Sequence, residues 1–175
     1  MLQLNRNFPQ PTGAPGNPAT PAVEAQAWMD WILTRSFSIS THFHGGAVVC
    51  NTAYDNCYTP EIVPRPCPPA GPDFHPRADE VVPSSRAYCD RMMDDGVSCG
   101  NQWPDCQTNG ASWYQISGSQ QDWEFHFANV PMMTMEMTSI KRPGGAALPG
   151  HYEDNKGAFH DFIMWPIRQL EKEGH

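Results

Sequence analysis

Six cysteines gathered in one central stretch constrain the fold of this chain more than any other feature of its sequence. An even number of closely grouped cysteines is typical of loops that disulfides hold together in an oxidising compartment. A structural metal site is the competing interpretation, but the chain has no C-x-x-C pair and the spacings match no zinc-finger pattern. We therefore expect disulfides, with the pairing left open, among Cys50, Cys57, Cys67, Cys89, Cys99 and Cys106.

Two helices are predicted in the first part of the sequence. One begins at Pro21 after Thr20 as N-cap, and it places Trp28, Trp31 and Ile32 on a buried face at i, i+3, i+4 spacing. The stretch from residue 52 to about residue 76 is rich in proline and has the pattern of a long loop. A second helix is predicted over residues 77–93, interrupted by a proline at position 83.

Strands are predicted on either side of that central region. Residues 36–41 are β-prone and lead into Gly45 and Gly46, which indicate a close backbone approach or a break in the strand. Methionines alternate with polar residues over 133–138, which predicts a strand with a carboxylate on its polar face. A last helix is predicted to begin near residue 154 or 155 and to kink at Pro166. Its apolar face is Phe159, Phe162, Ile163, Ile167 and Leu170.

Helices interleaved with short strands favour an α/β domain, and 175 residues are enough for one such domain. The formal net charge of −8, with only 11 scattered lysines and arginines, argues against binding to nucleic acid or to an anionic membrane. No apolar run is long enough to cross a bilayer, and no targeting signal is visible in the first residues.

Four residues are candidates for chemistry, and each has a plainer interpretation. His44, before two glycines, could bind a metal or be a structural hydrogen-bonding residue. Glu136 could be a general base or an exposed carboxylate on a solvated strand face. Arg6 could grip a carboxylate or lie in a polar surface loop. Tyr114, beside Trp113, could be catalytic or belong to the core.

The order of five sequence blocks decides between these interpretations. They read NRNFP, PAVEAQAWMDWI, FSISTHFHGGAVV, TNGASWYQISGSQQDWEF and MTMEMTSIKRP. In this order they resemble the zinc metallocarboxypeptidases, with the greatest similarity to the carboxypeptidase N and E subfamily. The similarity extends through LPGHYEDNKGAFHDFI to the last helix and is poor from residue 52 to residue 101. It implies an α/β fold with a mixed, mainly parallel sheet flanked by helices, and secreted or extracytoplasmic proteins.

The resemblance also implies roles for individual residues. Asn5 and Arg6 match the pair that clamps the free C-terminal carboxylate of a peptide, which makes the family exopeptidases. His44 matches a ligand of the single zinc ion, and Glu136 matches the general base that activates water. Tyr114 matches the mobile tyrosine that closes over the substrate.

Specificity is less well marked in the sequence. Gln121 matches a position at the floor of the pocket for the departing side chain. An acidic residue that would select substrates ending in Lys or Arg is expected in or near the divergent stretch. We expect residues 52–107 to form a divergent loop region rich in proline and cysteine.

One expected motif is absent, because no histidine in the chain is followed three residues later by glutamate. The H-x-x-E motif supplies two zinc ligands in the family, so residues 1–175 match a partial catalytic domain that lacks its N-terminal half. The leading hypothesis is a fragment, inactive alone, of a peptide-hydrolysing enzyme. A second is a non-catalytic protein that binds C-terminal peptides. A third is a rebuilt metal site, because His42 and His44 point to the same face of a strand.

Overall fold

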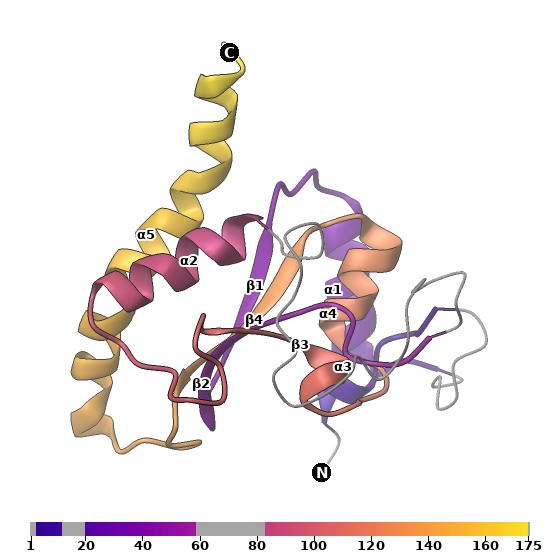
Figure 1. Ribbon diagram of the computed structural model, residues 1–175. Helices are drawn as coiled ribbons and strands as arrows, with labels where there is room; N and C mark the ends of the chain where they lie inside the picture. Colours follow the sequence, from indigo (N-terminus) through magenta and orange to yellow (C-terminus); the bar gives the residue numbers. More distant parts are fainter. Residues whose placement is uncertain (1–2, 12–19, 59–82, 175) are drawn as a thin grey trace. The chain divides into compact units, whose positions relative to one another are not determined.

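The computed structural model describes residues 3–11, 20–58 and 83–174 (Figure 1). These residues fall into two compact units. The first contains the described residues before residue 41 together with 53–58 and 109–132. The second contains residues 41–52, 83–108 and 133–174. Each unit is formed by segments that are far apart in the sequence, so the units are not successive domains.

A four-stranded sheet runs through the second unit in the order β1-β4-β2-β3. Strands β2 and β4 pair antiparallel, with Val49 opposite Glu136 and Cys50 opposite Met135. This mixed sheet with helices alongside confirms the predicted α/β class. The strands are β1 (Ser40–His44), β2 (Ala47–Thr52), β3 (Gln107–Asn109) and β4 (Met132–Thr138).

The paired glycines lie between β1 and β2, as a break between strands. Gly46 has φ of +131°, which favours glycine, and its N–H donates to the carbonyl of Thr138 at 2.7 Å. A Cβ on Gly45 would lie 3.1 Å from the carbonyl oxygen of Ile140. Both parts of the prediction are therefore met, because the strand breaks and a neighbouring backbone approaches closely.

Two helices of the second unit, α2 (Pro83–Asp94) and α5 (Leu148–Lys172), pack against each other (Figure 1). The buried Tyr88 hydroxyl donates to Asn155, and the rings of Tyr88 and Phe159 lie 5.9 Å apart. An ion pair adds to this contact, since Arg91 bonds Asp95 just after α2 and lies 3.8 Å from an oxygen of Asp161 on α5. A short 3-10 turn, η3 (Gly145–Ala147), precedes α5.

Disulfides form as the sequence predicts. Cys50 on β2 is bonded to Cys89 on α2, and Cys99 is bonded to Cys106. Cys57 is also disulfide-bonded. The first of these bonds fastens a helix to a central strand of the sheet.

The predicted helix starts need correction. Helix α5 begins at Leu148 instead of residue 154 or 155, because Pro149 suits the first helical turn. Asn155, which resembles a cap, is buried within α5 and donates to the carbonyl of His151 at 2.9 Å. Helix α2 begins at Pro83 and is not interrupted there, while residues 77–82 of the predicted helix lie outside the described residues.

The apolar face predicted for α5 is only partly buried. Phe162 is buried, and α5 continues past Pro166 to Lys172. Ile163, Ile167 and Leu170 are exposed, because the packing surface turns toward Ala158 and Phe162.

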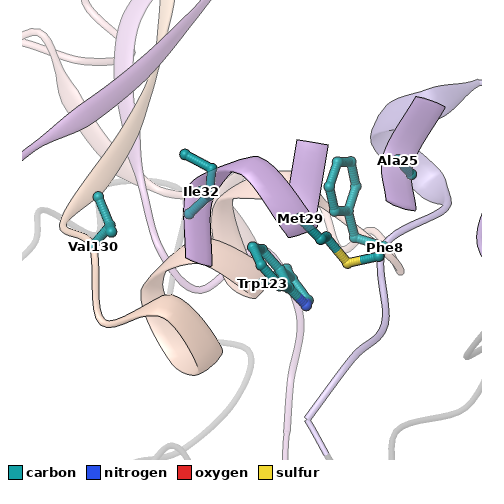
Figure 2. Close-up of a cluster of buried hydrophobic side chains, with 6 residues drawn as sticks. All are labelled: Phe8, Ala25, Met29, Ile32, Trp123 and Val130. Atoms are coloured by element: carbon teal, nitrogen blue, oxygen red, sulfur yellow. The ribbon is translucent and has the colours of Figure 1, made fainter. Parts of the chain in front are cut away.

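The first unit is built around helix α1 (Val23–Leu33) and a core of six side chains (Figure 2). The α1 prediction is wrong in two details. The helix begins two residues after Pro21, and Asn7 Oδ1 accepts from the N–H of Ala22, the residue before it. Trp28 and Trp31 are not buried, with 36% and 44% of their surface exposed. The core is Phe8, Ala25, Met29, Ile32, Trp123 and Val130.

Short elements carry the remaining candidate residues of this unit. They are η1 (Leu4–Arg6), α3 (Gly110–Trp113), α4 (Gln120–Trp123) and the π-helical turn η2 (Glu124–Ala128). The Phe8 and Trp123 rings lie 6.1 Å apart and join the segment after η1 to α4. This contact holds η1 in place by burial of aromatic surface.

Candidate functional site

Strands β1 and β4 bring four polar side chains together in the second unit. His42 and His44 are two residues apart on β1, and Thr134 and Glu136 are two residues apart on β4. Because side chains on a strand alternate between faces, each pair shares one face. His44 Nδ1 lies 3.5 Å from Glu136 Oε1, and His42 Nε2 forms a hydrogen bond with the Thr134 hydroxyl. We call these four residues the histidine–glutamate cluster.

Glu136 is buried, with 6% of its surface exposed. The interpretation of this residue as an exposed carboxylate is therefore wrong. Its Oε2 atom has no hydrogen-bond partner among the described residues. A buried polar atom left unpaired costs about 1–3 kcal/mol, so such an atom in a native fold calls for an explanation. It is suited to accept a proton from a group that is not part of this chain.

His44 is more open than Glu136, because 38% of its side chain is exposed. A partly exposed imidazole beside a buried carboxylate suits a zinc ligand. The residues that the structure describes contain no group of three or more His, Cys, Asp or Glu side chains that could hold a metal. Among these residues His44 remains a candidate for a single metal ligand.

The rings of His42 and His44 are stacked, with centroids 4.5 Å apart and an angle of 23° between their planes. This confirms that the two side chains share a face of β1. It does not support the rebuilt metal site, since no third donor of the described residues joins the pair in a metal-binding group.

The predicted carboxylate clamp lies in the first unit, on η1. Asn5 Oδ1 accepts a hydrogen bond from the backbone N–H of Gln120 at 2.8 Å, so its amide nitrogen is left to donate elsewhere. Arg6 donates from Nη1 to the carbonyl of Asn5 and is partly exposed. Among the residues described, no carboxylate forms a salt bridge with Arg6. Both side chains retain N–H groups that could donate hydrogen bonds to a planar carboxylate.

Gly118 fixes the backbone of this clamp. Its φ is +72°, and its carbonyl accepts from the N–H of Phe8 at 3.0 Å. A Cβ here would lie 2.6 Å from the carbonyl oxygen of Arg6 and 3.1 Å from that of Phe8. The clamp segment can approach this closely only because residue 118 has no side chain.

Gln121 lies in a buried polar network. Its Nε2 donates to Asp55 Oδ1 at 3.2 Å, and the N–H of Asp55 donates to Asp122 Oδ1 at 2.8 Å. The Tyr58 hydroxyl donates to Asp122 Oδ2 at 2.6 Å. Burial, and then the charge of Asp55, raise the pKa of Asp122 well above its usual value. Burial is also the main cause that raises the pKa of Tyr54 to about 12, and the charge of Asp122 adds to it.

Asp55 is a candidate that the residue-by-residue sequence analysis did not single out. It is only 2% exposed, next to Gln121, and lies within the stretch where an acidic specificity residue is expected. Its sequence context, AYDNCY, gives no periodic signal of burial. The only sequence signal that points to it is its place as the first acidic residue after the glycine pair.

Tyr114 follows α3 with an extended backbone, and its side chain is half exposed. Its ring contacts that of Trp113 at 4.9 Å. The core interpretation of Tyr114 is therefore wrong. The structure groups Asn5, Arg6, Tyr114 and Gln121 in the first unit, and His44 and Glu136 in the second.

Comparison with known proteins gives a consistent result. A family model described as "Zinc carboxypeptidase" matches residues 2–173. Carboxypeptidase D of Drosophila melanogaster is 31% identical over 187 residues, which cover 99% of this chain and 12% of that protein. Carboxypeptidase M of Mus musculus is 32% identical, covering 91% of this chain and 35% of the relative. The Mus musculus carboxypeptidase N catalytic chain is 30% identical, covering 93% and 39%.

The chain thus spans between 12% and 39% of the length of these relatives. In the described parts of the chain, no helix combines the length and apolar character that crossing a membrane requires.

Proposed function

This chain belongs to the zinc carboxypeptidase family, and on that premise we propose that it carries the general base and the substrate clamp for hydrolysis of a C-terminal peptide bond. One observation carries the proposal. Glu136 is a buried carboxylate with an unpaired oxygen, and it lies 3.5 Å from the partly exposed imidazole of His44. Such an oxygen can take a proton from an attacking water and return it to the leaving amine.

His44 is the residue of this chain that we assign to zinc. When bound, zinc would supply Lewis-acid polarisation of the scissile carbonyl and a lowered pKa of the attacking water. No histidine of the chain has a glutamate three residues on, so we propose that two further ligands come from outside these 175 residues. The chain by itself is then expected to bind a peptide without hydrolysing it.

Asn5 and Arg6 make the proposed reaction specific for chain ends. The Asn5 amide is oriented by the N–H of Gln120, and the Arg6 guanidinium has donors that match a planar carboxylate. A free C-terminal carboxylate satisfies these donors, whereas an internal peptide bond does not. The half-exposed Tyr114 is free to fold over a peptide held there.

A basic C-terminal side chain is the substrate class that the buried network supports best. Asp55 is nearly inaccessible to water, so the field of its carboxylate is weakly screened. Gln121 lies against Asp55 and adds a side-chain amide at the same place. We therefore assign preference for Lys or Arg to Asp55, with Gln121 at the floor of the pocket.

A second candidate function is binding of C-terminal peptides without catalysis. The observation that favours it is that the described residues contain no group of three or more His, Cys, Asp or Glu side chains that could hold a metal. The buried Glu136 favours hydrolysis, because a protein that only binds peptides has no use for an unpaired buried carboxylate oxygen.

The binding step can be tested on the 175-residue chain. A peptide ending in Arg with a free carboxylate should bind, as measured by calorimetry, and the same peptide with a C-terminal amide should bind at least about tenfold more weakly. Arg6→Lys keeps the charge but loses the planar fork, so it should weaken only the free-carboxylate peptide. Equal affinity for the two peptides would contradict the clamp.

The catalytic step needs a form of the protein in which the zinc ligands are complete. There, Glu136→Gln should lower kcat by about 10²–10⁴-fold and leave peptide affinity unchanged. Asp55→Asn should raise KM for peptides ending in Arg more than for those ending in Leu. Near-normal turnover of the Gln variant would remove Glu136 from the mechanism.

We also propose an oxidising, extracytoplasmic location. Its support is the set of disulfides at Cys50–Cys89, Cys99–Cys106 and Cys57. Such bonds persist where thiols are not kept reduced. The proposed partner is the C-terminus of a peptide or protein.

A further inference from the structure

The histidine–glutamate cluster contains two residues to which the proposed function gives no role. His44 and Glu136 form one row across β1 and β4, and His42 and Thr134 form a second row beside it. The two rows touch through the stacked histidine rings. Thr134 is 5% exposed and is paired through its backbone with Asn51 on β2, so the second row rests on the middle of the sheet.

We propose that His42 is a positioning residue that fixes the ring plane of His44. This inference rests on the proposed function, in which His44 is a zinc ligand. The Thr134 hydroxyl holds the His42 ring by a hydrogen bond, and the His42 ring then limits rotation of the His44 ring by stacking against it.

The need for such support follows from the surroundings of His44. Its side chain is 38% exposed, and its contact with Glu136 is 3.5 Å long, which is too long for a strong hydrogen bond. An imidazole held by this contact alone would sample several orientations about its two side-chain torsions. Metal ligands are normally oriented by a neighbouring group, and loss of that group weakens metal binding.

Strand geometry explains how His42 can restrict rotation of the His44 ring. Residues i and i+2 of a strand lie on one face, so a ring at position 42 meets the ring at position 44 without distortion of the backbone. The hydrogen bond to Thr134 comes from the neighbouring strand and is partly buried, which makes it a fixed point and not a solvent contact.

The test measures the order of the His44 ring in the 175-residue chain, labelled at histidine carbons, by NMR relaxation. Thr134→Val removes the hydroxyl with little change of shape and should lower the His44 order parameter. Thr134→Ser keeps the hydroxyl and should restore it. His42→Ala should lower the order at least as much as Thr134→Val, and His42→Phe, which keeps a ring, should retain part of it.

Two matched controls separate positioning from general loosening of the strands. Thr138→Val makes the same substitution on β4 at a residue whose hydroxyl accepts from the N–H of Ile140. His160→Ala removes an exposed histidine on α5. Neither should change the order of the His44 ring. Backbone amide spectra of all variants report whether the sheet is intact.

Zinc titration of the same samples distinguishes this inference from the proposed function. If zinc shifts the His44 resonances, Thr134→Val and His42→Ala should weaken that binding about 10-fold or more, and Thr134→Ser should not. If zinc leaves His44 unaffected while ring order still depends on His42 and Thr134, positioning stands and the ligand assignment fails. Unchanged ring order in both Thr134→Val and His42→Ala, with an intact sheet, would overturn the inference whatever zinc does.

Discussion

Burial of the Glu136 carboxylate lowers the stability of the fold. The carboxylate is buried, one of its oxygens is unpaired, and the neighbouring His44 lies at a distance that gives only weak compensation. Residues that a reaction needs are often kept although they lower the stability of the fold, and Glu136 has the features of such a residue.

We therefore expect Glu136→Gln to stabilise the 175-residue chain. A neutral amide costs less to bury than a carboxylate, so the free energy of unfolding in urea should rise by about 1 kcal/mol at neutral pH. Thr134→Gln on the same strand, which removes no charge, is the control and should destabilise. A Glu136→Gln variant that unfolds more easily than the parent would show that the carboxylate is well compensated.

Asp122 gives a prediction about pH. Its folded-state pKa lies above its ordinary value of 3.8, first because of burial and then because of Asp55. A group of this kind favours the fold while it is protonated, so its contribution is fully present below pH 3.8 and is lost as pH rises through the folded-state pKa. Stability attributable to Asp122 should therefore fall with rising pH.

Asp122→Asn should abolish that fall. The amide can still accept from the N–H of Asp55 and can donate to the Tyr58 hydroxyl, so the network survives with one bond reversed. The difference in unfolding free energy between variant and parent should grow in favour of the variant by up to about 1.4 kcal/mol per pH unit above the unfolded-state pKa. A difference that does not vary between pH 4 and pH 8 would contradict the raised pKa.

For single residues, the sequence predicted where the candidate residues lie in the chain better than it predicted their burial and their hydrogen-bond partners. The period-2 pattern predicted the strand that carries Glu136, but a polar residue on one face of a strand does not reveal that both faces are covered. Asp55 was not found because its burial depends on contacts with Gln121 and Asp122, which are more than 60 residues away.

Among the elements, the turn that contains Gly118 determines the position of η1. Its positive φ and its contacts with the backbone of Arg6 and Phe8 leave no room for a side chain. Gly118→Ala should therefore reduce the free energy of unfolding by about 2–5 kcal/mol, from left-handed strain together with overpacking. It should also weaken binding of free-carboxylate peptides, because Arg6 is displaced.

Gly100→Ala is the matched control for that variant. Gly100 has the same φ of +72°, but a Cβ there would meet nothing within 4 Å. It should cost only the strain, about 1–2 kcal/mol, and leave peptide binding unchanged. Similar costs for the two variants in denaturant titrations would mean that the clamp backbone can move aside.

The ends of elements were predicted less well than their existence, and the reason is tertiary contact. Thr20 and Pro21 resemble a helix start, yet the hydrogen bond from Ala22 to Asn7 moves the start of α1 to Val23. Helix α5 begins at Leu148, before the predicted cap at residue 154 or 155. Asn155 lies inside the helix, where its side chain accepts a hydrogen bond from Tyr88 of α2. Local signals cannot report a partner that comes from elsewhere in the sequence.

For the whole molecule, the Cys50–Cys89 and Cys99–Cys106 disulfides should contribute unequally to stability. A cross-link stabilises mainly by restricting the unfolded chain, and more so when it closes a longer loop. Cys50–Cys89 closes a separation of 39 residues, whereas Cys99–Cys106 closes one of 7. Replacing both cysteines of a pair by alanine should therefore cost about 4 kcal/mol for the first and about 2 kcal/mol for the second. Thermal unfolding with and without reductant would measure both, and a reversed order would show that native contacts dominate.

The sequence was sufficient to predict the α/β class, the presence of disulfides and the family. It could not predict that three separate segments make up each unit, because this depends on contacts between residues that are distant in the chain. The exposure of Ile163, Ile167 and Leu170 on α5 likewise depends on which other segments pack against this helix, and periodicity does not report that.

The Cys50–Cys89 bond also bears on when such a protein could begin to work. Cys50 lies one residue along β2 from Val49, which is paired with Glu136. The helix that braces the base-bearing part of the sheet is therefore tied down by an oxidation, a step that a newly synthesised chain in a reducing environment has not undergone. Under the proposed oxidising location, the part of the sheet that carries the proposed base would gain this support only once the disulfide had formed.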